Sequence, residues 1–221
     1  MKRETMRTLI PAALAAALLA GCSSPSGSGT DAGTGKNGDS APAEGTEAAE
    51  SAPAEAAEKG GSLGGPGSAC ELPVSFDLAA GWKPQAVEVE PGSDLAALAE
   101  QGSATMVCEI DAKPAGNIGY LRVWQGKGSG TAPRAALEDF LAGDPNAAKA
   151  SYEETGAGQV VASEVTYTVH SELMDEDKPE RAFAVATPDG PVVVHLGGLD
   201  STEHEEMLPA YELARKSLKL G

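Results

Sequence analysis

The composition of this chain changes abruptly near residue 70, and that change limits which part of it can fold. Residues 23–69 consist mostly of Gly, Ser, Ala, Pro and Glu, with no aromatic residue and with Leu63 as the single large aliphatic side chain. Such a segment cannot bury enough apolar surface to offset the entropy lost on ordering. We therefore expect a disordered tether over residues 22–69 and one domain over residues 70–221, a length of about 150 residues that suffices for a single core.

A basic and apolar leader precedes the tether. Its first seven residues include three basic side chains, and residues 9–20 form an apolar run. That run is too short to cross a bilayer of about 30 Å as a helix. The leader closes with Leu-Ala-Gly-Cys and resembles the signal peptides of bacterial lipoproteins. The resemblance implies a lipoprotein signal peptide over residues 1–21, cleavage before Cys22, and a diacylglycerol on the Cys22 thiol. An ordinary secretory signal is the alternative.

Lipidation would determine where the protein works. Two acyl chains give stable membrane anchoring, whereas one chain binds only marginally. A lipidated Cys22 therefore predicts a protein anchored to the extracytoplasmic face of the bacterial cell membrane, with the membrane itself as one partner. As a flexible coil of about 47 residues, the tether would reach roughly 40 Å from this anchor. The domain would then stand away from the membrane surface.

Acidic residues dominate the predicted domain. Residues 70–221 contain 25 Asp and Glu against 11 Lys and Arg, which gives a formal net charge of -14. Like charge repels an anionic partner within a Debye length of about 8 Å. Nucleic acid, teichoic acids and anionic lipid headgroups are therefore disfavoured as partners, whereas cations and basic protein surfaces are compatible. The solubility of an exported domain explains the same acidity without any partner.

Two cysteines lie in the predicted domain, Cys70 at its start and Cys108 in an apolar strand. Export places both in an oxidising compartment. We therefore expect one Cys70–Cys108 disulfide, which would stabilise the fold by about 4 kcal/mol in the chain-entropy model. Two buried thiols or a metal pair are the alternatives. The chain has no Cys-x-x-Cys spacing and its three histidines are scattered, so the sequence predicts no metal site.

A glycine-rich segment at residues 126–131 follows a predicted strand and precedes a predicted helix, as a phosphate-binding loop does. Such a loop has four residues between its first Gly and a Gly-Lys-Ser/Thr sequence. Here Lys127 is instead followed by Gly128. The segment therefore predicts a flexible connection, and we expect no cofactor.

The apolar residues of the domain recur with two spacings. Alternation with polar residues predicts half-buried strands, and a spacing of three to four residues predicts amphipathic helices. The first two strands are expected to pair as a hairpin through residues 79–82, and either Ser201 or Thr202 is expected to cap the last helix. Strands are predicted over residues 74–78, 87–89, 106–110, 118–124, 160–169, 182–186 and 192–196, and helices over residues 93–102, 133–143 and 202–218.

Short links between these elements predict a mainly antiparallel sheet flanked by helices, which is an α+β fold. At residues 74–82, Val-Ser-Phe-Asp-Leu-Ala-Ala-Gly-Trp resembles the opening strand and Gly-Trp turn of PsbP-like domains, and residues 214–218 resemble their terminal helix. The resemblance implies an α/β/α sandwich and an accessory or protein-binding role, with no catalytic residue to carry over. The leader, tether and domain size are similar to those of LpqN-like lipoproteins of actinobacteria.

Patterns for catalysis and calcium binding are weak in this sequence. The Gly-x-Ser-x-Gly turn that presents a nucleophilic serine is absent, and His195, which lies among apolar residues, is typical of a structural side chain. Residues 175–180 offer carboxylates to calcium but lack the regular spacing of calcium-binding loops, so we expect a solvated turn there. Trp82 and Trp124 are expected to pack in the core or at a sheet edge and not to form a platform for sugars.

Three functions are compatible with the sequence. We expect a non-catalytic envelope lipoprotein whose acidic domain binds a protein partner or a small ligand. The protein-binding role predicts a contiguous exposed apolar patch and no deep pocket. A carrier of an apolar molecule would need a deep cavity lined by residues such as Met106, Val165 and Leu208. An envelope hydrolase would need a polar cleft that contains a group with a shifted pKa.

Overall fold

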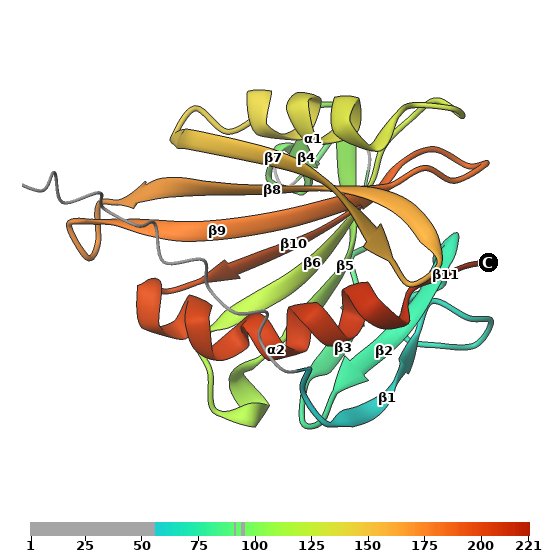
Figure 1. Ribbon diagram of the computed structural model, residues 1–221, viewed down its shortest axis with the longest axis horizontal. Helices are drawn as coiled ribbons and strands as arrows, with labels where there is room; N and C mark the ends of the chain where they lie inside the picture. The colour runs from blue at the N-terminus through green and yellow to red at the C-terminus, as the bar shows by residue number, and fades with distance from the viewer. Residues whose placement is uncertain (1–55, 91, 94–95) are drawn as a thin grey trace, which may run out of the picture. The chain divides into compact units, whose positions relative to one another are not determined.

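The computed structural model describes residues 56–90, 92–93 and 96–221. The predicted signal peptide, Cys22 and most of the predicted tether lie outside these residues. The described chain forms two antiparallel sheets, two α-helices and two short 3₁₀ helices (Figure 1). Among the described residues, no helix combines the length and the apolar character needed to span a membrane.

The larger sheet has the strand order β3-β5-β6-β10-β9-β8-β7, and every neighbouring pair is antiparallel. The short strand β4 pairs with β5 outside this path. Strands β7 to β10 follow one another along the chain apart from short turns, so most of the sheet is built from consecutive hairpins. Its strands are β3 (Lys83–Ala86), β4 (Glu100–Gln101), β5 (Ala104–Asp111), β6 (Gly119–Gln125), β7 (Ala147–Ala157), β8 (Val160–Ser171), β9 (Glu176–Val185) and β10 (Val192–Gly198).

The smaller sheet joins the beginning and the end of the domain. Its order is β1-β2-β11, in which β1 (Lys59–Leu63) and β11 (Lys219–Leu220) both pair antiparallel with β2 (Val74–Ala79). Val74, Phe76 and Leu78 of β2 are buried, while the alternate residues are partly exposed. This alternation is what a strand with one solvated face requires.

The two α-helices lie on opposite faces of the larger sheet (Figure 1). Helix α1 (Pro133–Ala142) packs across β7, β8 and β9, whereas α2 (Ser201–Ser217) packs on the other face and contacts β2, β9 and β10. The smaller sheet lies on the same side as α2. The connections η1 (Ala96–Ala99) and η2 (Lys113–Ala115) are single 3₁₀ turns. The predicted α+β fold with a mainly antiparallel sheet and flanking helices is confirmed.

Each face of the larger sheet has its own hydrophobic core. The core beneath α1 is smaller and contains Trp124 of β6 together with Leu137 and Phe140, and the burial of the latter two follows from the apolar spacing of α1. The core on the α2 side also takes in the smaller sheet and the disulfide. Its largest fully buried side chains are Leu63, Val74, Phe76, Ile110, Leu121, Phe183, Leu196, Met207, Tyr211 and Leu218.

The domain begins before residue 70, so the predicted boundary of the tether is wrong. Strand β1 lies inside the segment that composition assigned to disorder. Close packing requires glycine at Gly60 of β1 and at Gly64 just after it, because a Cβ at Gly60 would lie 2.5 Å from the Cα of Ala80, and one at Gly64 would lie 1.9 Å from the carbonyl oxygen of Val74. Leu63, the single large aliphatic side chain of that segment, enters the core.

Leu63→Ala is expected to lower the free energy of unfolding by about 2–3 kcal/mol, because a buried leucine leaves a cavity when it is truncated. Leu63 is 1% exposed. Urea denaturation of the full chain measures the change. Leu98→Ala is the matched control, since Leu98 is 73% exposed and should change stability by less than about 0.5 kcal/mol. Equal effects of the two substitutions would contradict the place of β1 in the core.

The strands between residues 79 and 111 pair differently from the prediction. The expected hairpin between the first two strands does not form, because β2 belongs to the smaller sheet and β3 pairs with β5. Strand β3 also begins before the predicted residues 87–89, of which Val87 donates one hydrogen bond to the carbonyl of Val107. The helix predicted after Ser93 is, in its described part, only the single turn η1.

Three further differences concern the second half of the domain. Strand β7 was not predicted, because this edge strand is polar and almost wholly exposed and has no apolar alternation. Strand β9 begins at Glu176, so it includes most of the segment 175–180 that was predicted as a turn. Asp200, not Ser201 or Thr202, caps α2, and its carboxylate accepts a hydrogen bond of 2.8 Å from the Glu203 amide.

Candidate functional site

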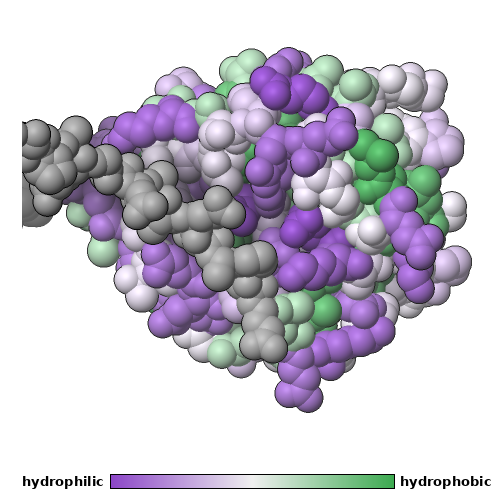
Figure 2. Space-filling view, in the orientation of Figure 1, coloured by the Kyte–Doolittle hydropathy of each residue, from purple (hydrophilic) through white to green (hydrophobic). Residues whose placement is uncertain are grey.

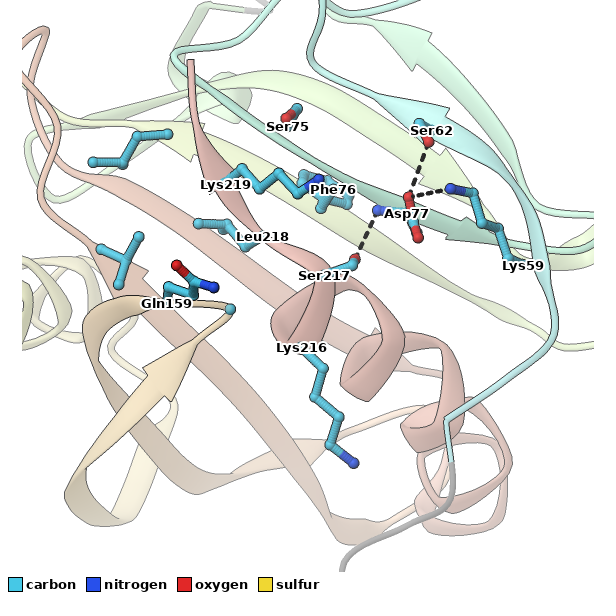
Figure 3. Close-up of a pocket in the computed structure, with 13 residues that line it drawn as sticks. Lys59, Ser62, Ser75, Phe76, Asp77, Gln159, Lys216, Ser217, Leu218 and Lys219 are labelled. Atoms are coloured by element: carbon cyan, nitrogen blue, oxygen red, sulfur yellow. Dashed lines mark hydrogen bonds and ion pairs between the residues drawn. The ribbon is translucent and has the colours of Figure 1, made fainter.

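A pocket of the described chain lies where the smaller sheet meets the end of α2 and the turn between β7 and β8. Its volume is about 800 Å³. The labelled side chains of Gln159, Leu218 and Lys219 lie toward one end of the pocket in Figure 3, and Asp77 lies toward the other. The pocket is lined by Lys59, Ser62, Ser75, Phe76, Asp77, Gly158, Gln159, Val160, Lys216, Ser217, Leu218, Lys219 and Leu220.

Strand alternation places the polar residues of the smaller sheet on the pocket side. Ser75 and Asp77 occupy the partly exposed positions of β2, between the residues that enter the core. Ser62 stands opposite Asp77 in the β1–β2 register, and Lys219 stands opposite Ser75 in the β2–β11 register. Since paired residues share a face of the sheet, the smaller sheet brings hydroxyl, carboxylate and ammonium groups to the pocket wall.

A glycine holds the β7–β8 turn against the end of α2. Gly158 has a φ of 56°, and its amide donates a hydrogen bond of 2.8 Å to the carbonyl of Arg215. A Cβ at this position would lie 1.9 Å from the carbonyl oxygen of Leu218. The close approach therefore needs glycine both for its backbone conformation and for space, and it brings Gln159 and Val160 to the pocket.

Asp77 is the only carboxylate among the residues that line this pocket, and it already has partners. Its Oδ1 atom lies 2.8 Å from Lys59 Nζ and accepts a hydrogen bond of 2.9 Å from Ser62 (Figure 3). Partial burial would raise the pKa of Asp77, but these two hydrogen bonds and the charges of Lys59 and Lys219 outweigh burial and lower that pKa. Asp77 therefore stays ionised, and its charge is offset by Lys59.

The end of α2 contributes basic residues to the pocket, and few of its hydrogen-bond acceptors are free. Ser217 Oγ donates to the carbonyl of Leu213 at 2.6 Å and accepts a hydrogen bond of 2.8 Å from the Asp77 amide. Lys216 Nζ lies 3.2 Å from Glu212, and in Figure 3 its side chain extends away from Asp77. No carboxylate of the described chain forms an ion pair with Lys219.

The titratable groups whose pKa values shift most lie elsewhere, buried on the two faces of the larger sheet. On the α1 face, Glu180 accepts hydrogen bonds from Tyr167 at 3.0 Å and from Lys178, and its Oε2 atom lies 2.8 Å from His195 Nε2. Burial would raise the pKa of Glu180, but the charges and hydrogen bonds of His195 and Lys178 hold that pKa at about 2. Burial also raises the pKa of the Tyr167 hydroxyl.

A second buried polar group lies on the α2 face. Tyr211 donates a hydrogen bond of 2.6 Å to Glu164 Oε1, and the same oxygen lies 3.9 Å from Arg181 Nη1. Burial raises the pKa of Glu164 and, together with the charge of Glu164, raises the pKa of Tyr211. Burial and the charge of Arg181 lower the pKa of His204 to about 4. None of these groups lines the pocket, so we assign them a structural role in the interior of the fold.

The predicted disulfide is present. Cys70 lies in the connection between β1 and β2, Cys108 lies in β5, and the Cα atoms of the bonded pair are 5.9 Å apart. Both residues are buried in the core on the α2 side. The bond therefore ties the start of the smaller sheet to the larger one.

The carboxylates predicted as a weak calcium alternative do not converge on one point. Asp177 is exposed and pairs with Lys149 at 3.0 Å, whereas Glu180 is buried within its own network. Glu176 accepts a hydrogen bond from the Ser201 amide at 3.2 Å. Across the described residues, no three His, Cys, Asp or Glu side chains are placed to hold a metal ion.

Other residues from the sequence prediction are dispersed. Val165 belongs to the core beneath α1 and Met106 packs against that core, whereas Leu208 packs against the core on the opposite face. These three residues therefore cannot line one cavity, and that part of the carrier prediction is wrong. Trp82 and Trp124 are buried, as predicted.

The sequence prediction missed the pocket as a whole. Lys59 and Ser62 lie in the segment that was assigned to the tether, and Lys219 lies beyond the predicted end of the last helix. Only the alternation of β2 could have indicated that Ser75 and Asp77 face solvent.

Six large apolar side chains of the described chain are exposed. The face drawn in Figure 2 is mostly hydrophilic, with small apolar areas between polar side chains. Apart from the neighbours Leu173 and Met174 in the β8–β9 connection, the large apolar side chains that are exposed lie far apart in the sequence, namely Leu98, Ile118, Val161 and Leu220.

Comparisons with known proteins support a lipoprotein. A family model described as an uncharacterised lipoprotein matches residues 40–218 of this chain. The chain is also similar to the solution structure of cyanobacterial PsbP (CyanoP) from Synechocystis sp. PCC 6803, with 14% sequence identity, a TM-score of 0.44, and coverage of 73% of this chain and 98% of that chain. No curated protein matches the chain.

Proposed function

Since this chain belongs to the family of uncharacterised lipoproteins, we propose that it is anchored through a lipidated Cys22 to the extracytoplasmic face of the bacterial cell membrane. We further propose that its acidic domain binds a protein partner or a small ligand and catalyses no reaction. The leader that ends in Leu-Ala-Gly-Cys supports the anchor. The similarity of leader, tether and domain size to LpqN-like lipoproteins of actinobacteria supports the same assignment.

The observation that carries the binding role is the pocket beside α2. It is open, it is about 800 Å³ in volume, and its wall combines hydroxyl and ammonium groups with apolar side chains. Binding sites are typically concave and place a few polar groups among apolar ones. Catalytic sites, by contrast, concentrate groups with strongly shifted pKa values in a cleft. The groups whose pKa values shift most, Tyr167, Glu180, His204 and Tyr211, lie outside this pocket.

Cys22→Ser is expected to release the protein from the membrane fraction, because the thiol that would carry the diacylglycerol is lost. The measurement is immunoblotting of membrane and soluble fractions from the producing cell after high-salt washing. The protein with Cys22 should stay with the membranes, whereas the variant should appear in the soluble or secreted fraction. Equal distribution of the two proteins would contradict the lipid anchor.

Crosslinking in the producing cell tests the binding role. A photoreactive amino acid at Ser75 or Gln159, which line the pocket, should capture a partner on irradiation. The same amino acid at the exposed Leu98, which does not line the pocket, is the matched control. Native mass spectrometry of the purified full chain then tests for a small ligand. No pocket-specific crosslink and no co-purifying mass would contradict the proposed function.

A further inference from the structure

The charges around the pocket beside α2 are opposite in sign to those of the protein as a whole. The chain has 33 Asp and Glu against 16 Lys and Arg, yet three lysines and a single aspartate line the pocket. That aspartate is ion-paired with Lys59. Lys219 has no such partner within the described chain. A lysine ammonium group that forms no ion pair and lies beside a concave surface is a recognition element for an anion.

The carbonyl groups at the end of α2 repel an anion less strongly than the carbonyl groups of an uncapped helix end would. The C-terminal end of a helix carries partial negative charge on its unpaired carbonyls. Here the Ser217 hydroxyl donates a hydrogen bond to the Leu213 carbonyl, and the Gly158 amide donates one to the Arg215 carbonyl. Arg215 and Lys216 in the last turn also offset this partial charge.

The pocket offers donors for an oxyanion and an apolar surface for the group attached to it. Lysine ammonium groups, serine hydroxyls and a glutamine amide are donors that phosphate oxygens accept. The lining also includes Val160, Leu218 and Leu220. A volume of about 800 Å³ is larger than a lone phosphate needs and is within the usual range for small organic ligands.

We propose that this pocket binds a phosphate ester, with Lys219 as its principal charged contact and Ser75 and Gln159 as hydrogen-bond donors. This inference rests on the proposed binding function and names its ligand class. The acidity of the whole domain does not prevent it, because charges beyond a Debye length of about 8 Å are largely screened and the groups nearest the ligand dominate. The same chemistry is available from a soluble phosphate ester and from the headgroup of phosphatidylglycerol.

Isothermal titration calorimetry with glycerol 3-phosphate and the full chain tests the proposal. Binding is expected, and it should weaken as salt increases. Neutral glycerol should not bind. Lys219→Ala should weaken binding by about fivefold, the factor expected from the loss of one nearby charge in water. Lys113→Ala removes an exposed lysine that does not line the pocket and is the matched control. Circular dichroism confirms that each variant is folded.

Flotation with vesicles distinguishes the two sources of the ester. The full chain with Cys22→Ser is mixed with phosphatidylglycerol vesicles or with phosphatidylcholine vesicles, each with and without Lys219→Ala. Binding to phosphatidylglycerol that depends on Lys219 would support the lipid headgroup, and binding of glycerol 3-phosphate alone would support a soluble ester. The proposal is overturned if the protein binds neither glycerol 3-phosphate nor phosphatidylglycerol vesicles. It is also overturned if Lys219→Ala binds them as well as the protein with Lys219 does. If a partner is still crosslinked at Ser75, the binding function stands without this ligand class.

Discussion

Glu180→Ala is expected to lower the free energy of unfolding by about 3–5 kcal/mol, because removing one member of a buried ion pair leaves the Lys178 ammonium group without its counter-charge. Glu180 is 8% exposed. It holds Lys178 by an ion pair and lies 2.8 Å from His195. Urea denaturation at neutral pH measures the loss.

The same carboxylate should give the domain an acid-sensitive component of stability. Glu180 has a pKa near its ordinary value of 4.5 in the unfolded chain and of about 2 in the folded chain. The unfolded chain therefore binds more protons between these values. The stabilisation is complete above pH 4.5 and is lost as the pH falls toward 2. The gap between the two pKa values corresponds to about 3 kcal/mol.

Glu180→Gln separates this component from other effects of acid. The stability difference between the unmodified protein and Glu180→Gln should shrink by about 3 kcal/mol between pH 6 and pH 2. Glu205→Ala, which removes an exposed carboxylate of α2, should cost less than about 0.5 kcal/mol at neutral pH. If Glu180→Ala costs no more than Glu205→Ala, or if the difference between the unmodified protein and Glu180→Gln does not change with pH, the Glu180 network does not stabilise the fold.

Cys70→Ala together with Cys108→Ala is expected to lower the free energy of unfolding by about 4 kcal/mol. The disulfide closes a loop over a sequence separation of 38 residues, and its loss gives the unfolded chain more conformations. The bond also fixes the β1–β2 connection to β5. Urea denaturation under non-reducing conditions compares the double variant with the oxidised protein.

Three controls identify the cause of that loss. Each single substitution should destabilise the domain about as much as the double variant does, because either one removes the bond. A reducing agent should lower the stability of the unmodified protein and leave that of the double variant unchanged. A double variant as stable as the oxidised protein would show that the disulfide contributes nothing to the fold.

How far the fold could be predicted differs between its apolar and its polar elements. The alternation in β2, β5, β6 and β8 and the spacing in α1 and α2 predicted these elements, because each buries one side of a regular structure. Strand β7 has no such signal, since its stability comes from main-chain hydrogen bonds to β8. Strand β1 was missed for the same reason, because glycine-rich composition indicates disorder unless a partner strand is known.

The sequence by itself determined the α+β class, the cysteine pair, and the leader on which the membrane anchor rests, since each depends on residues that are close in sequence or few in number. Only the tertiary structure decided where the domain begins, which strands pair, and that Lys59, Asp77, Gln159 and Lys219 share one pocket. These residues are brought together by strand pairing and by the packing of the Gly158 turn on α2. Contacts between residues so far apart in sequence leave no local pattern, so the candidate site could be recognised only in the folded chain.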